Sequence, residues 1–200
     1  MSMRSPNLRW LLLLLALSTA GLAPAQSPTQ ATSTASDEDE TEDNSEFALT
    51  FSRAAGAPGE EVVLPVYFTR RPGAPNVEKL TLRLSYPKSV VIYNKAEDAY
   101  LSRRAGIDIH AEAKTSGEQS VLEISFTLPD PAEKDFPSGQ IAYLHFTISS
   151  EADDQTVHLK PELWIDEQAV TASNSLARVE EGTILISASP IIVGCFFFTH

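Results

Sequence analysis

Residues 47–68 hold two runs of alternating apolar and polar residues, FALTFSRAAGAPGEEVVLPVYF, joined by a Gly-Ala-Pro-Gly turn. In the second run every even-numbered residue from Val62 to Phe68 is apolar, while Val63, Pro65 and Tyr67 fall on the opposite face. A period of two is expected of a strand that buries one side. Pro65 has no N–H to donate, so we expect its strand to lie at a sheet edge or to carry a bulge there. The segment predicts the opening of a β-sandwich rather than an enzyme core.

The same alternation recurs in further short runs that are separated by turn residues. With no helix-length amphipathic stretch outside residues 95–104, these runs predict an all-β fold, an antiparallel two-sheet β-sandwich. A jelly-roll topology of about nine strands is the expected order. An immunoglobulin-like order stays open, because alternation reports which face is buried and not how strands connect. The runs lie at residues 79–86, 90–93, 107–114, 121–128, 141–148, 157–164 and 183–186.

The first 25 residues are typical of a secretory signal peptide. Arg4 and Arg9 precede an apolar core at residues 10–17, which is too short to span a bilayer, and Ala23-Pro24-Ala25 fits a cleavage site. The alternative is an uncleaved membrane anchor. We expect cleavage after Ala25 and a secreted, periplasmic or cell-surface protein, with no membrane span in the mature chain.

The remaining chain divides by composition into three parts. Residues 26–45 are rich in Ser, Thr and acid, include the run DEDETED, and predict a disordered linker. Residues 46–189 have the size of one domain. Residues 190–200, PIIVGCFFFTH, are apolar and β-prone, and a docked strand, a partner-binding segment and an artefact of the gene's end all stay open as explanations. Cys195 is the only cysteine, so no intrachain disulfide is possible.

Charge and motifs exclude two functional classes. The formal net charge is -12 and no basic patch occurs, so we expect no nucleic-acid partner, because phosphate binding needs clustered Lys and Arg. A nucleophile elbow, an H-E-x-x-H pair and a Gly-rich phosphate loop are missing from the sequence. The four histidines are not spaced as metal ligands along one element. We therefore predict a protein that is not an enzyme, with no catalytic residue, no metal and no cofactor.

Four segments occur in order along the chain: GAPGEEVVLPVYF, LTLRLSYPKSVVIYNKA, GQIAYLHFTISSEA, and ELWIDEQAV followed by EEGTILIS. Together they resemble the cohesin domain, the receptor module of cellulosome scaffolds and related surface proteins. The final strands lie around a terse turn at Asp166-Glu167, without the family's customary glycine, and Tyr86 replaces the family's usual Asp before a turn proline. The resemblance implies a jelly-roll sandwich that acts as a non-catalytic extracellular receptor and holds a dockerin-bearing partner through one sheet face. The dockerin calcium loop is missing from this chain, so a dockerin-like partner would be a separate protein.

Outward residues of the central strands are the candidate binding site. If the strands neighbour one another as in cohesins, one face carries Thr81, Glu112 and Ser125 together with the six residues that we predict to bind the partner. An ordinary solvated face is the plain alternative. Tyrosine is enriched at interfaces, so Tyr143 is the expected anchor. Metal binding by His110, Glu112 and His145 is a minor alternative. The six predicted residues are Arg83, Asp108, His110, Glu123, Tyr143 and His145.

Two other functions stay open at this stage. A carbohydrate-binding module of the same fold would use exposed aromatic residues, and a polysaccharide would then be the partner. The lone Trp164 in LKPELWI is more typical of a core residue, and no row of aromatics accompanies it. A structural subunit of an envelope assembly is the third candidate, with residues 190–200 supplying the contact. A link to polysaccharide catabolism follows from the cohesin resemblance alone.

Overall fold

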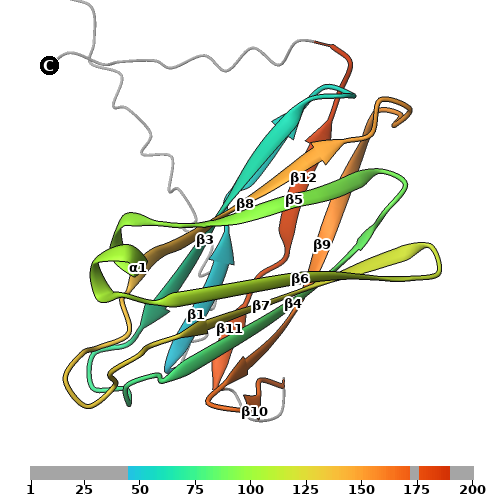
Figure 1. Cartoon of the computed structure of the whole chain (residues 1–200). Helices are drawn as coiled ribbons and strands as arrows, with labels where there is room; N and C mark the ends of the chain where they lie inside the picture. The colour runs from blue at the N-terminus through green and yellow to red at the C-terminus, as the bar shows by residue number, and fades with distance from the viewer. Residues whose placement is uncertain (1–44, 172–175, 190–200) are drawn as a thin grey trace, which may run out of the picture. The chain divides into compact units, whose positions relative to one another are not determined.

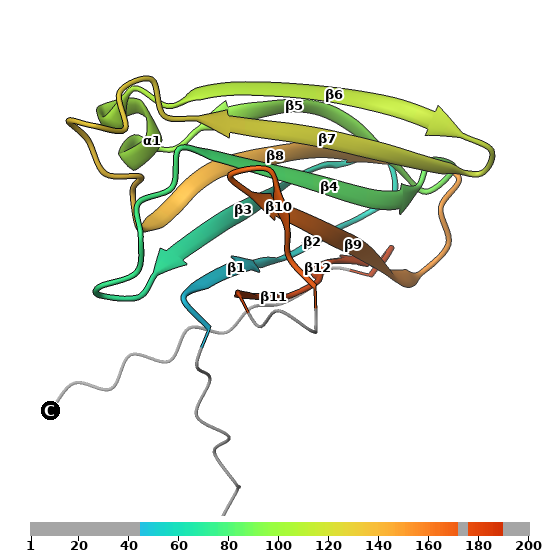
Figure 2. The same ribbon diagram turned by 90° about the horizontal axis from the view of Figure 1, so that it is seen from below.

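The structure, a computed structural model, describes residues 45–171 and 176–189. These residues form a sandwich of two β-sheets (Figure 1) whose layers are seen from below in Figure 2. The predicted all-β sandwich fold is thus confirmed. The predicted signal peptide at residues 1–25, the linker up to residue 44, and the tail at residues 190–200 with Cys195 lie outside the described residues.

Each sheet has its own strand order. The sheet that contains β8, called here the β8 sheet, runs β11 (Ala177–Val179), β1 (Phe47–Phe51), β3 (Glu61–Arg70), β8 (Gly139–Ile148), β5 (Val91–Asp98). The other, called the β4 sheet, runs β2 (Arg53–Gly56), β12 (Gly182–Ile186), β9 (Gln155–Ile165), β4 (Lys79–Pro87), β7 (Gln119–Thr127), β6 (Asp108–Ser116), and β10 (Gln168–Ala169) pairs with β9.

Most neighbouring strands are antiparallel, as predicted, but two pairs at the chain ends are parallel. β1 pairs with β11 and β2 with β12 in this way. The first strand run is interrupted at Ser52, so that β1 lies in the β8 sheet and β2 in the β4 sheet. The last run is divided in the same manner between β11 and β12. The two ends of the described chain therefore tie the sheets together along one side of the sandwich.

The core is formed by the inward residues of the alternating runs. In β4, Leu80, Leu82 and Leu84 are fully buried, and their partners in β7 are Phe126, Ile124 and Leu122. A buried tyrosine, Tyr86, continues the inward series and meets the ring of Phe146 edge-on, with centroids 5.5 Å apart. Tyr86 therefore adds apolar surface to the core.

Pro65 occupies an interior strand, so the prediction of a sheet edge is wrong, whereas the alternative of a bulge is correct. β3 pairs with both β1 and β8, and its register with β8 shifts between Val66 and Tyr67. The Pro65 carbonyl accepts a hydrogen bond from the N–H of Ser52, the residue at which the chain leaves this sheet. Because N and O of one strand residue point to the same side, the missing N–H faces the place where β1 ends.

One short helix, α1 (Tyr100–Ala105), covers part of the predicted helical stretch. The first four residues of that stretch, 95–98, belong to β5. Ser102 fixes the helix to the sandwich, because its buried hydroxyl donates a hydrogen bond of 2.7 Å to the Ile141 carbonyl of β8. Over residues 45–171 and 176–189, no helix has the length and apolar character needed to cross a membrane.

Candidate functional site

The outer face of the β4 sheet carries four of the six predicted residues. Arg83 comes from β4, Glu123 from β7, and Asp108 and His110 from the edge strand β6. The register places Arg83 opposite Glu123, and His110 opposite Ser125. They share this face because the neighbouring positions in each strand are apolar and turn toward the core. The structure therefore brings these four residues onto one surface.

Tyr143 and His145 do not belong to that surface, so the prediction that all six residues share one face is wrong. Both lie on β8, which pairs with β3 and β5 in the other sheet. Their side chains point outward from the opposite side of the sandwich. The metal alternative fails for the same reason, because His145 cannot converge with His110 and Glu112. Over the described ranges, no three His, Cys, Asp or Glu side chains gather in a way that would hold a metal ion.

Arg83 is held by two contacts on the outer face of the β4 sheet. Its Nε donates a hydrogen bond of 2.6 Å to Oε2 of Glu123. Its Cζ lies 4.6 Å from the centroid of the Trp164 ring, a cation–π arrangement. The Arg83 guanidinium holds the pKa of the Glu123 carboxyl below its usual range, mainly through this hydrogen bond. The guanidinium is thus oriented on the surface while 45% of the Arg83 side chain stays exposed.

Trp164 is the residue of this site that sequence reasoning missed. It is only partly buried and lies opposite Thr81 of β4, so the prediction of a core position is wrong. The signal was present in β9, where Val157, Leu159, Leu163 and Ile165 are buried at odd numbers. An even-numbered tryptophan in such a strand points outward. Together with Arg83 and Glu123 it forms what we call the Arg83 cluster.

The other outer face is built around His145, whose side chain is 12% exposed. Its Nδ1 lies 2.7 Å from Oε1 of Glu61 on β3, and its Nε2 lies 3.4 Å from Oε2 of Glu97 on β5. Lys95 pairs with Glu97 and holds the pKa of that carboxyl below its usual range. The hydroxyl of Tyr143 donates a long hydrogen bond of 3.4 Å to Gln140. His145 therefore lies between carboxylates from both neighbouring strands of the β8 sheet.

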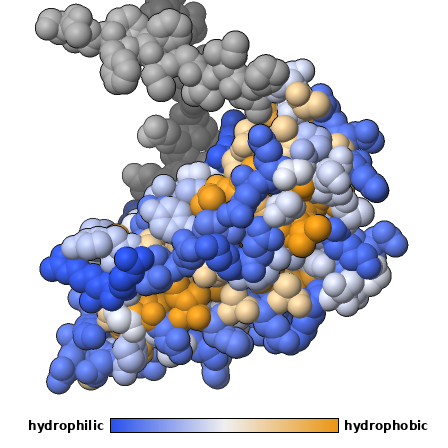
Figure 3. Space-filling model, turned by 45° about the horizontal axis from the view of Figure 1, so that its top comes forward, coloured by the Kyte–Doolittle hydropathy of each residue, from blue (hydrophilic) through white to orange (hydrophobic). Residues whose placement is uncertain are grey.

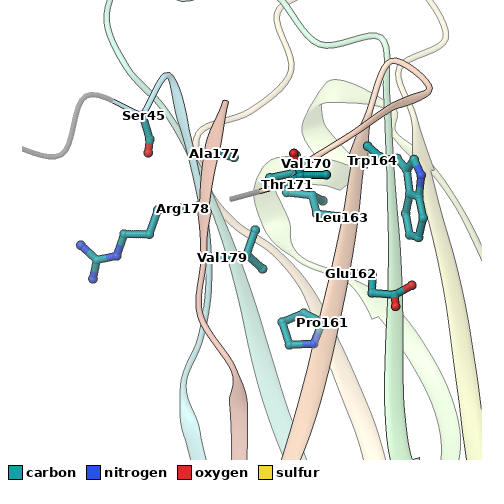
Figure 4. Close-up of a pocket in the computed structure, with 11 residues that line it drawn as sticks. Ser45, Pro161, Glu162, Leu163, Trp164, Val170, Thr171, Ala177, Arg178 and Val179 are labelled. Carbon is teal, nitrogen blue, oxygen red and sulfur yellow. The ribbon is translucent and has the colours of Figure 1, made fainter. Parts of the chain in front are cut away.

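A pocket of about 720 Å³ opens between β9 and β11. Figure 4 shows Leu163 and Val179 pointing into the space between these strands, while Trp164 projects from the far side of β9. Because β9 and β11 belong to different sheets, the pocket is an opening between the two sheets. Most of its wall is apolar. The residues that line it include none of the six predicted residues.

The comparisons with known proteins bear on the fold. No protein-family model and no curated protein sequence matches the chain. A type I cohesin–dockerin complex from Clostridium thermocellum is similar in structure with a TM-score of 0.55 and 10% identity, covering 70% of this chain and 99% of the cohesin. The seventh ScaB type I cohesin of Pseudobacteroides cellulosolvens gives a TM-score of 0.54 with 14% identity, covering 76% and 98%.

Similarity extends to a cohesin from outside cellulosomes. A non-cellulosomal cohesin of the archaeon Archaeoglobus fulgidus gives a TM-score of 0.50 with 17% identity and covers 72% of this chain and 93% of its own. All three identities are low, so these likenesses bear on the fold. The chain has the cohesin fold, a jelly-roll sandwich, and the resemblance seen in the sequence motifs is confirmed at that level.

Proposed function

We propose that this chain is a non-catalytic binding module that recognises a dockerin-type protein on a separate chain. The observation that carries the proposal is the cohesin fold, since cohesins of the same fold have been solved in complexes with dockerins. A fold by itself does not define a function, so binding of a dockerin-type partner also requires a suitable surface. We assign that surface to the outer face of the β4 sheet.

The Arg83 cluster has the properties of an interface anchor. Tryptophan and arginine are enriched among the residues that contribute most to binding, and a stacked arginine loses little further rotamer freedom when a partner binds. Because Glu123 holds Nε, the terminal nitrogens of Arg83 stay available as donors. Thr81 and Ser125 lie beside the cluster and add hydroxyl groups. A polar partner surface with acceptor groups fits this arrangement.

Secretion and a link to polysaccharide breakdown form part of the same proposal. They rest on the N-terminal signal-peptide pattern and on the cellulosomal origin of several of the similar structures. The proposed module would hold its partner outside the cell or at its surface. Asp108 and His110, at the edge of the same face, would contact the rim of the partner.

The test is direct binding of purified dockerin modules to the immobilised full chain, measured by surface plasmon resonance with and without a calcium chelator. We expect calcium-dependent binding to at least one module, because dockerins carry paired calcium loops. Arg83→Ala and Trp164→Ala should each weaken that binding at least about tenfold. The matched control is Glu61→Gln on the opposite face, which should leave it unchanged. Binding that ignores both cluster variants, or no binding across the panel, would contradict the proposal.

Carbohydrate binding is the second candidate, and the partial exposure of Trp164 is the observation that favours it. It ranks below protein binding because the Arg83 guanidinium already lies over the ring where a sugar would stack. Affinity electrophoresis in gels with soluble polysaccharide separates the two. Retardation that Trp164→Ala abolishes, with no dockerin binding, would favour the carbohydrate function.

A further inference from the structure

β6 is a long edge strand with one neighbour. All nine of its residues pair with β7, from Asp108 opposite Thr127 to Ser116 opposite Gln119. Among the described residues β6 pairs with no other strand. It crosses the front of the molecule in Figure 1 and follows the upper rim in Figure 2. An edge of this kind presents a row of unpaired backbone N–H and C=O groups to any strand that fits it.

The outward side chains of β6 form a pattern of charge. Asp108, His110, Glu112 and Lys114 are all exposed and lie on the outer face, in the order acid, imidazole, acid, ammonium. Ile109, Ala111 and Ala113 take the other face, opposite the buried residues of β7. In the view of Figure 3 apolar side chains form separate patches that are bordered by hydrophilic ones. The order of charges is therefore the distinctive feature of this edge strand.

The charge pattern is complementary to itself when reversed. If a second β6 lies antiparallel with a two-fold axis at Ala111, Asp108 faces Lys114 of the second copy. In the same register His110 faces Glu112 of the second copy, and an imidazole N–H donates to a carboxylate in either charge state. Because the interface is symmetric, each of these contacts occurs twice. We propose that β6 is a self-association edge, and that its occupant is β6 of a second copy of this chain in this register.

A second observation supports this register. Within one chain Glu112 lies directly opposite Glu123 of β7. Like charges at directly opposite positions destabilise a strand pair. Lys114 offsets part of this by pairing with Glu112 at 3.0 Å, and Arg83 by pairing with Glu123. In the dimer, the imidazole of His110 from the second copy would lie next to Glu112, on the side away from β7.

The inner side of the strand fits the same arrangement. Ala111 would face its own symmetry mate, and Ala113 would face Ile109 of the second copy. Ala113 is exposed in the single chain, whereas Ile109 packs partly on the core. The Arg83 cluster is centred two strands away on β4, and only the rim residues Asp108 and His110 belong to both proposed surfaces. This inference does not rest on the proposed dockerin binding.

Charge reversal tests the register by sedimentation equilibrium of the full chain over a range of concentrations. We expect a reversible dimer whose dissociation constant rises at least about tenfold with Asp108→Lys or with Lys114→Asp, because each change places two like-charge pairs across the interface. The swap that combines both should restore dimerisation to within about threefold. Positions 108 and 114 are about 20 Å apart along one strand, so a contact within one chain cannot explain such a rescue. Lys160→Glu on β9 is the matched control and should have no effect.

Cysteine cross-linking tests the same register independently. In a Cys195→Ser background, Ala111→Cys should form an interchain disulfide on mild oxidation, because residues directly opposite in an antiparallel pair have Cα atoms about 5 Å apart. Ala113→Cys should not, since its symmetry mate would lie more than about 7 Å away. A chain that stays monomeric up to about 1 mM overturns the proposal. So does a dimer that tolerates the single reversals, or one that the charge swap fails to restore.

Discussion

The stack of Arg83 on Trp164 gives a prediction whose size follows from the structure. The guanidinium carbon lies 4.6 Å from the ring centroid, well within the range of a cation–π contact. Because 45% of the Arg83 side chain is exposed, the pair should contribute about 0.5 to 1 kcal/mol to stability. Arg83→Ala also removes the hydrogen bond to Glu123, worth about 0.2 to 1 kcal/mol at this exposure. The single substitution should therefore cost about 0.7 to 2 kcal/mol.

A double-mutant cycle separates the stack from the other losses. The wild type, Arg83→Ala, Trp164→Ala and the double variant are unfolded in urea, and unfolding is followed by circular dichroism because the tryptophan is itself replaced. We expect a coupling free energy of about 0.5 to 1 kcal/mol. The matched control is the cycle of Lys160→Ala with Trp164→Ala, because Lys160 is an exposed cation of the same strand. Additivity within about 0.3 kcal/mol for the Arg83 cycle would refute the stack.

Three further predictions concern single positions. The pKa of the Glu123 carboxyl is lowered in the folded state by Arg83, so its contribution to stability is present at neutral pH and is lost as pH falls through that lowered value. Glu123→Gln should thus cost at most about 1 kcal/mol at pH 7, and urea unfolding should show the difference vanishing in acid rather than persisting. Asp166 has a φ of 46° and accepts two backbone hydrogen bonds of 2.8 Å at the start of β4, so Asp166→Ala should cost about 2 kcal/mol in the same assay, and a loss under about 0.5 kcal/mol would contradict this role. Ser102→Ala leaves the buried Ile141 carbonyl without its side-chain donor and should cost about 1 to 2 kcal/mol, whereas an unchanged melting temperature would mean that this hydrogen bond contributes nothing.

Residue alternation predicted the faces of the strands well. The even-numbered residues of β3 and the leucines of β4 are buried as expected, because a strand alternates its side chains whatever its neighbours are. Trp164 follows the same rule, because its even-numbered position in β9 points outward, although its residue type predicts a core position. A large aromatic residue is usually buried, but the ring of Trp164 lies on the surface, where the charged guanidinium of Arg83 packs against it.

The neighbours of each strand were less predictable. Tyr143 and His145 were correctly expected to point outward, yet they do so from the β8 sheet. Pro65 was correctly associated with a bulge, but its strand is interior because β1 leaves the sheet at Ser52, opposite the missing donor. Four of the six candidate residues therefore share one face of the sandwich, and Trp164 lies on the same face.

The fold class, the inward and outward faces of the strands, and the order of acidic and basic residues along β6 follow from the sequence alone. All three are local properties, because they depend only on a period of two and on residue type. The tertiary structure decided which strands are neighbours, and hence that Arg83 meets Glu123 and Trp164 from three separate strands while His145 meets Glu61 and Glu97 on the other side. Strand pairing joins residues that are far apart in the chain, and Glu61 and His145, for example, are separated by 84 positions. Its energy depends on packing between partners that no single stretch of sequence contains.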